Sequence, residues 1–101
     1  MKIDIKIEEN AVRASLEGRL DTASVQDCAP DFQTLNEQAD KRITLDCNQL
    51  NYISSSGLRL LLTLRKEVEA KGGHLIVEHI TDEIRNVFTL TGFFKLFDIR
   101  S

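Results

Sequence analysis

The segment of this chain with the clearest chemical potential is a run of three serines and a glycine at residues 54–57. It stands between a predicted strand and an apolar helix pattern that begins at Leu58. A serine hydroxyl at a helix start accepts a hydrogen bond from an unpaired backbone N–H, which is worth about 1 kcal/mol. One capping serine is enough, so a purely structural role and a role in binding or modification both stay open for this segment.

The helix that follows the serines predicts where each of them points. Successive residues rotate by about 100°, so a regular helix places Ser55, Arg59, Leu62 and Lys66 on one flank, and Ser56 points elsewhere. Leu61, Leu64 and Val68 lie away from this flank, in an apolar face that also includes Leu58. A phosphate on Ser55 would add roughly −1.5 to −2 charges, would suit the helix terminus and could pair with Arg59. We therefore expect modification to alter docking and to leave the fold intact.

Enzymatic use of Ser55 is not supported by its surroundings. A hydrolase nucleophile needs an activating base and usually a glycine two positions before it, where Ile53 stands here. The histidines, His74 and His79, flank a predicted strand instead. We therefore predict that the chain is not an enzyme.

Two cysteines, Cys28 and Cys47, do not form a disulfide framework and are predicted to be buried small apolar side chains. Their spacing relative to His74 and His79 does not match a metal-ligand pattern. Gly72 and the glycine after it precede a strand, whereas a phosphate-binding loop opens a helix. No metal or cofactor is expected.

The composition is that of an ordinary globular protein. The 101 residues are 42% hydrophobic and 29% charged, which suits a single domain spanning residues 1–101. The net charge of −3 and the lack of a long basic cluster argue against a nucleic-acid partner. No apolar run approaches the roughly 20 residues of a membrane span, and the first residues do not resemble a signal peptide. We expect a cytoplasmic protein without membrane insertion.

The first half of the chain changes from strand to helix periodicity. Alternating apolar residues at 3–7 and 12–16 predict a β-hairpin that turns at Glu9 and Asn10. Helical spacing then predicts a helix across roughly 23–39, in which Pro30 either causes a kink or stands at the start of the regular part.

The second half alternates strand and helix. A strand around 43–47 and a helix ending at Gly72 are followed by a strand at 75–77, which is expected to be covered on both faces. Thr81 is expected to cap a third helix that ends at Gly92. The apolar tail after it should pack in the core rather than form a dimer surface, with a short last strand. The order predicts an α/β fold with a mixed β-sheet of four to five strands and helices packed against it.

Several segments together resemble one known family. Residues 45–58 are similar to the signature of STAS-domain anti-sigma factor antagonists. Residues 18–21 resemble that family's turn after the second strand, and residues 71–75 resemble its turn into the fourth strand. Residues 83–97 resemble its closing helix and tail. The resemblance covers almost the whole chain in the right order and implies a STAS-type single domain.

The resemblance implies a partner switch. In this family the unmodified protein binds an anti-sigma factor with serine-kinase activity and so releases a sigma factor. Phosphorylation of one serine abolishes binding, and a serine phosphatase acts on the phosphorylated form. The family's target lies two positions before the motif glycine, which corresponds to Ser55, and Ser54 stands where many members carry Asp. The expected partner-binding residues are Asp21, Ser54, Ser56, Arg59 and Leu62.

Two alternatives stay open from the sequence. Asp21 matches a family loop acid near the phosphorylation site, yet the same residue could cap a turn or a helix. STAS-like proteins also serve as cytoplasmic accessory subunits of lipid-transport ABC systems, in which the same helix would dock on the transporter. The genes next to this one would separate the two functions.

Overall fold

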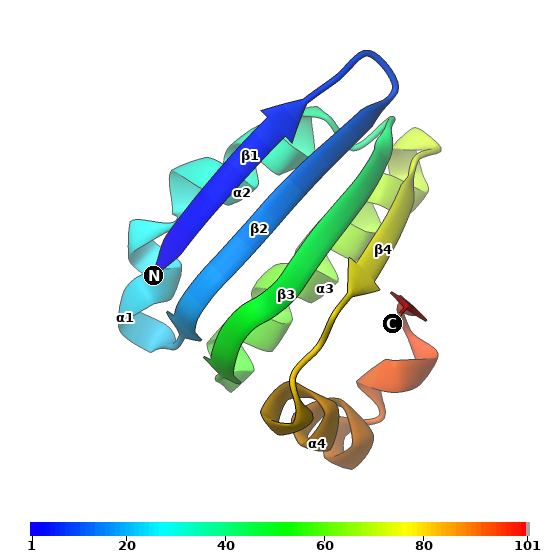
Figure 1. The fold of residues 1–101 in the computed structure, drawn as a ribbon. Helices are drawn as coiled ribbons and strands as arrows, with labels where there is room; N and C mark the ends of the chain where they lie inside the picture. The colour runs from blue at the N-terminus through cyan, green and yellow to red at the C-terminus, as the bar shows by residue number, and fades with distance from the viewer. Residues whose placement is uncertain (101) are drawn as a thin grey trace.

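The computed structural model describes residues 1–100, which form one five-stranded sheet with helices along one face (Figure 1). In chain order the elements are β1 (Lys2–Ile7), β2 (Ala11–Leu20), α1 (Thr22–Asp27), α2 (Ala29–Glu37), β3 (Arg42–Ile53), α3 (Ser55–Lys71), β4 (His74–Glu78), α4 (Asp82–Thr91), the 3-10 turn η1 (Phe93–Lys95) and β5 (Asp98–Arg100). The strand order is β1-β2-β3-β4-β5; β1 and β2 are antiparallel, and each later pair is parallel. Within these residues no helix is long and apolar enough to cross a membrane. The predicted α/β fold with a mixed sheet is confirmed.

The predicted hairpin is formed by β1 and β2. The backbone N–H of Glu8 donates to the carbonyl of Ala11 at 2.8 Å, which closes a tight turn. The period of two in β2 places Val12, Ala14 and Leu16 in the core, while the residues between them face away.

The prediction of one helix across 23–39 is wrong, because the segment forms two helices. α1 ends at Asp27, and Cys28 interrupts the helix with φ −98° and ψ 7°. Pro30 lies in the first turn of α2, where its missing N–H would have no helical partner in any case. The alternative in which the regular part begins near Pro30 matches this arrangement.

The predicted third strand is confirmed, but it extends beyond the residues in which apolar and polar side chains alternate. β3 continues through the polar stretch after Cys47, because β2 lies beside it and supplies backbone partners as far as the Leu20–Ile53 pair. Pairing with a neighbouring strand is a tertiary contact, and the hydrophobic pattern does not report it.

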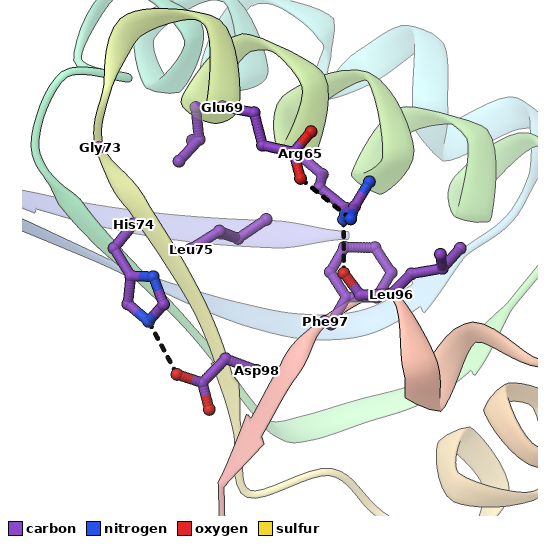
Figure 2. Close-up of a pocket in the computed structure, with 9 residues that line it drawn as sticks. Arg65, Glu69, Gly73, His74, Leu75, Leu96, Phe97 and Asp98 are labelled. Carbon is purple, nitrogen blue, oxygen red and sulfur yellow. Dashed lines mark hydrogen bonds and ion pairs between the residues drawn. The ribbon is translucent and has the colours of Figure 1, made fainter.

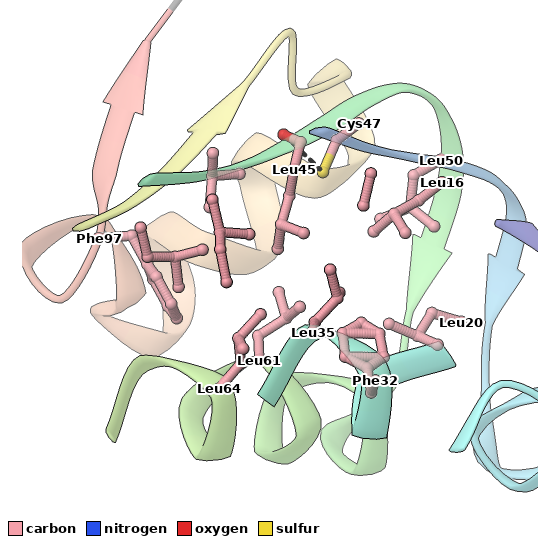
Figure 3. Close-up of a cluster of buried hydrophobic side chains, with 14 of the residues drawn as sticks. Leu16, Leu20, Phe32, Leu35, Leu45, Cys47, Leu50, Leu61, Leu64 and Phe97 are labelled. Atoms are coloured by element: carbon pink, nitrogen blue, oxygen red, sulfur yellow. Dashed lines mark hydrogen bonds between the residues drawn. The ribbon is translucent and has the colours of Figure 1, made fainter. Parts of the chain in front are cut away.

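All four helices contribute to one apolar core on a single face of the sheet (Figure 3). Leu45 and Cys47 point into it from β3, Leu61 from α3, and Phe88 from α4. β4 is buried on both faces, as expected, since the successive residues Leu75, Ile76 and Val77 are all buried. Ile76 is buried but lies outside this core, on the face that carries no helix within residues 1–100.

The C-terminal tail is part of the core, as predicted. Phe97 stacks on Phe88 with ring centroids 6.0 Å apart, and β5 pairs with β4. Figure 2 shows a hollow of about 140 Å³ where the tail meets α3. There Arg65 Nε donates to the carbonyl of Leu96 at 2.5 Å, and His74 Nε2 lies 2.7 Å from Asp98 Oδ2. These contacts fasten the tail to α3 and β4.

Candidate functional site

The sheet brings two distant segments together at the carboxyl ends of β2 and β3. Leu20 lies opposite Ile53 in the parallel ladder, so the chain leaves the two strands side by side at Asp21 and Ser54. The backbone N–H of Ser54 donates to the carbonyl of Leu20 at 2.9 Å. Since each strand leads directly into a helix, the starts of α1 and α3 are neighbours.

Gly57 permits this close approach. It is buried in the first turn of α3, and a Cβ there would lie 2.8 Å from the carbonyl oxygen of Leu20 and from side-chain carbons of Leu20 and Ile53. Contacts under 3.0 Å require something to move, and a backbone oxygen moves least readily. The glycine of the serine motif is therefore a packing requirement.

The three serines occupy three different environments. Ser54 is the N-cap of α3, and its Oγ accepts a hydrogen bond from the N–H of Gly57 at 3.2 Å. Ser56 is half-buried, with its Oγ 3.5 Å from Thr22 Oγ1 of α1. Ser55 is exposed, and within residues 1–100 its hydroxyl forms no hydrogen bond. Ser54 alone therefore performs the helix-capping role that the sequence left open for this motif.

Asp21 caps α1. Its carboxylate accepts a hydrogen bond from the N–H of Ser24 at 3.0 Å, and Ser24 Oγ accepts one from the N–H of Asp21 at 2.8 Å, which forms a capping box. The hydrogen bonds from Ser24 hold the pKa of Asp21 below its usual value, and the charge of Arg19 acts in the same direction. The other oxygen, Oδ2, lies 3.8 Å from Arg19 Nε. The capping role is established, and Asp21 directly precedes Thr22, whose Oγ1 lies 3.5 Å from Ser56 Oγ of α3.

A groove separates α1 from the first half of α3. Its volume is about 330 Å³, and it has an apolar floor with polar rims. Ser56 and Arg59, two of the sequence-predicted site residues, line it. We call this feature the α1–α3 groove; its lining residues are Thr22, Val25, Gln26, Ser56, Arg59, Leu60 and Thr63.

The remaining predicted residues lie on the outer flank of α3. Ser55, Arg59 and Lys66 are exposed and Leu62 is half-buried, at the helical spacing expected for one face. Neither Arg59 nor Lys66 belongs to an ion pair within residues 1–100. The exposed flank therefore carries two cations available to an anionic group.

Sequence reasoning missed residues that only the tertiary structure brings to this site. Thr22 and Gln26 reach the groove because α1 packs on α3. Arg19 lies directly across from Tyr52 in the β2–β3 ladder, and its guanidinium stands 4.2 Å from the ring centroid. Among the missed residues Leu60 had a sequence signal, because Leu60 and Leu62 together widen the apolar arc of α3 beyond the roughly 100° stripe that covers a sheet face.

The two histidines are engaged away from the serines. His74 contacts Asp98 of β5, and His79 Nδ1 lies 3.2 Å from Asp46 Oδ1 of β3. Neither forms a hydrogen bond to a serine within residues 1–100. Both cysteines are free and buried, and the described residues hold no cluster of three or more His, Cys, Asp or Glu side chains suited to a metal ion.

Comparison with known proteins assigns the family. The family model described as the STAS domain matches residues 2–101. The chain belongs to the STAS domain family. An anti-sigma-B factor antagonist of Bacillus subtilis is 30% identical over 100 residues, which cover 98% of this STAS domain and 90% of the relative.

Solved STAS structures agree with this fold. The anti-sigma factor antagonist SpoIIAA in its unphosphorylated form matches with a TM-score of 0.69 and 25% identity, over 88% of this chain and 83% of that one. The Bacillus cell fate determinant SpoIIAA in its phosphorylated form matches with a TM-score of 0.73 and 24% identity, over 99% and 92% of the two chains. The anti-sigma-B factor antagonist and unphosphorylated SpoIIAA favour anti-sigma factor antagonism over the transporter-subunit alternative.

Proposed function

We propose that this STAS domain is a non-enzymatic anti-sigma factor antagonist controlled by phosphorylation of Ser55. It binds an anti-sigma factor with serine-kinase activity, so that a sigma factor is released, and a serine phosphatase returns the phosphorylated form to the binding state. The named relatives support the antagonist role, and the existence of SpoIIAA in both forms supports phosphate control.

The observation that carries the proposal is the division of roles among the three serines. Ser54 is committed to capping α3, and Ser56 faces Thr22 at the α1–α3 groove. Ser55 alone of the three is exposed with an uncommitted hydroxyl. A kinase can reach this hydroxyl without breaking a contact that holds the domain together.

A phosphate at Ser55 changes charge without disturbing the fold. Ser55 is the first residue of α3, where unpaired N–H groups and the helix dipole favour negative charge. The exposed Arg59, one turn further on, can pair with it. The added charge of roughly −1.5 to −2 would also repel an acidic partner and neutralise the cations of this flank. The switch therefore acts on docking.

The proposed docking surface combines the α3 flank with the α1–α3 groove. Arg59 belongs to both, since it lines the groove and lies one turn after Ser55. Leu62 supplies apolar area on the outer side, and Asp21 and Ser54 border the surface at the helix starts. Ser56 contributes a polar rim at the groove, and the proposed docking region consists of these five residues around Ser55.

Two measurements test the proposal. The purified domain is incubated with ATP and the anti-sigma kinase of the same genome, and mass spectrometry locates the phosphate, which should be on Ser55. Binding to that kinase is then measured by titration calorimetry. Ser55→Ala should bind like the wild type and resist phosphorylation, and Ser55→Asp should lose at least about tenfold in affinity, as expected when a charge is placed against a docking surface.

A charge-matched control separates docking from net charge. Asn10→Asp adds the same charge at the β1–β2 turn, at the opposite end of β2 from the start of α3, and should leave affinity unchanged. Phosphate on Ser54 or Ser56, or undiminished binding by Ser55→Asp, would contradict the assignment.

A further inference from the structure

The outer edge of β1 is unpaired and carries a regular order of charges. β1 lies at one end of the sheet, and within residues 1–100 it pairs with β2 alone (Figure 1). It runs for six residues without a proline, and its ladder with β2 is uninterrupted. A free edge of this kind offers backbone N–H and C=O groups to another strand.

The hairpin turn determines which groups face this edge. Glu8 donates its N–H to Ala11 across the turn, so Glu8 bonds toward β2. Bonding and non-bonding positions alternate in an antiparallel ladder, and the other even-numbered residues of β1 therefore also bond to β2. The N–H and C=O groups of Ile3, Ile5 and Ile7 consequently point toward the open edge.

Charge selects one register for a second copy of this strand. In an antiparallel pair of β1 strands, the residues that bond across the new edge must lie opposite each other, so odd-numbered residues face odd-numbered residues. Three registers of this kind overlap well, and their two-fold axes pass through Asp4, Ile5 or Lys6. The register centred on Asp4 places two Asp4 side chains opposite each other, and the register centred on Lys6 does the same with two Lys6 side chains, so both oppose like charges. Centring on Ile5 places Lys2 opposite Glu8 and Asp4 opposite Lys6, each twice by symmetry.

The same register pairs the apolar residues on the core side of the sheet. Ile3 would face Ile7 of the second copy, and Ile5 would face its own equivalent. Ile7 is 50% exposed, while Ile3 and Ile5 already pack against the core cluster. Pairing would cover the exposed isoleucine and extend the apolar layer, and opposite charges and β-branched pairs both stabilise adjacent strands.

We infer that the chain forms a symmetric dimer through β1, with antiparallel strands centred on Ile5 and one sheet continuing across the two-fold axis. The interface is isologous, as such an axis requires. It includes none of the residues around Ser55, so it is independent of the proposed function.

The test is the mass of the intact protein in solution, measured by sedimentation over a concentration series. The wild type should reach a dimer. Lys6→Asp sets two like-charged pairs into the interface and should raise the dimer dissociation constant by about tenfold. Lys6 lies opposite Arg13 within the chain, so Asp there removes an internal like-charge pair and should not oppose folding.

Charge reversal provides the decisive control. Asp4→Lys combined with Lys6→Asp recreates opposite-charge pairs in the same register and should restore the dimer. Lys2→Glu combined with Glu8→Lys tests the outer pair independently, and circular dichroism verifies that every variant is folded. A wild type that stays monomeric at all concentrations would overturn the inference. A folded Lys6→Asp that dimerises like the wild type would also overturn it, as would double variants that stay monomeric.

Discussion

The backbone N–H of Ser54 donates to the carbonyl oxygen of Leu20 at 2.9 Å, and this bond joins the start of α3 to the end of β2. Because of this hydrogen bond, Asp21 and Ser54 cap neighbouring helices although they are 33 positions apart in sequence. The exposed Ser55 therefore lies next to a backbone hydrogen bond that holds the two helix starts together.

Gly57→Ala should destabilise the domain. Alanine is intrinsically better than glycine inside a helix by about 1 kcal/mol. Here, however, its Cβ would lie 2.8 Å from a backbone oxygen of Leu20, and overpacking of a tight site costs about 1–3 kcal/mol. We expect a net loss of free energy of unfolding in urea titrations. An unchanged or higher midpoint would show that the helix start moves away without cost.

Ser54→Ala should remove the α3 cap and lower the free energy of unfolding by about 1 kcal/mol. Ser55→Ala is the matched control and should stay within about 0.5 kcal/mol of the wild type, because its hydroxyl is exposed and unbonded. Urea denaturation of both variants measures the difference. Equal losses from the two substitutions would refute the division of roles between these serines.

Asp21→Asn should change how stability depends on pH. The native pKa of Asp21 lies below its ordinary value of 3.8, so the native state binds fewer protons than the unfolded chain in acid. This contribution is present above pH 3.8 and is lost as pH falls through the lower native value. Asparagine caps about as well and does not titrate.

The two proteins should therefore have similar stability at neutral pH, and the wild type should become the less stable of the two as the pH falls below about 4. Chemical denaturation at a series of pH values measures this difference. Asp46 and Asp98 also have lowered pKa values and titrate in both proteins, so they cancel in the comparison. Parallel stability curves down to the lowest pH would count against the capping carboxylate.

Both thiols should be unreactive in the folded protein. Burial raises the pKa of Cys47 to about 12 and also raises the pKa of Cys28. Since the thiolate is the nucleophile, a disulfide reagent such as DTNB should label neither cysteine until the chain unfolds. Absorbance measurements in native buffer and in guanidinium test this. Rapid labelling in native buffer, faster than unfolding, would contradict the burial of these side chains.

The amino-acid sequence by itself determined the elements whose signals are local. The alternation in β1 and β2, the cap at Thr81 and the stop at Gly72 each depend on a few neighbouring residues, and all were predicted. The flank of α3 that carries Ser55 also followed from helical periodicity alone.

Only the tertiary structure decided the contacts between segments that are distant in sequence. The polar end of β3 is a strand because β2 lies beside it, and Asp21 reaches Ser54 because parallel strands end at one edge of the sheet. The requirement for Gly57 and the α1–α3 groove arise from packing between elements. Periodicity records which face of an element is apolar, and it carries no information about which other element covers that face.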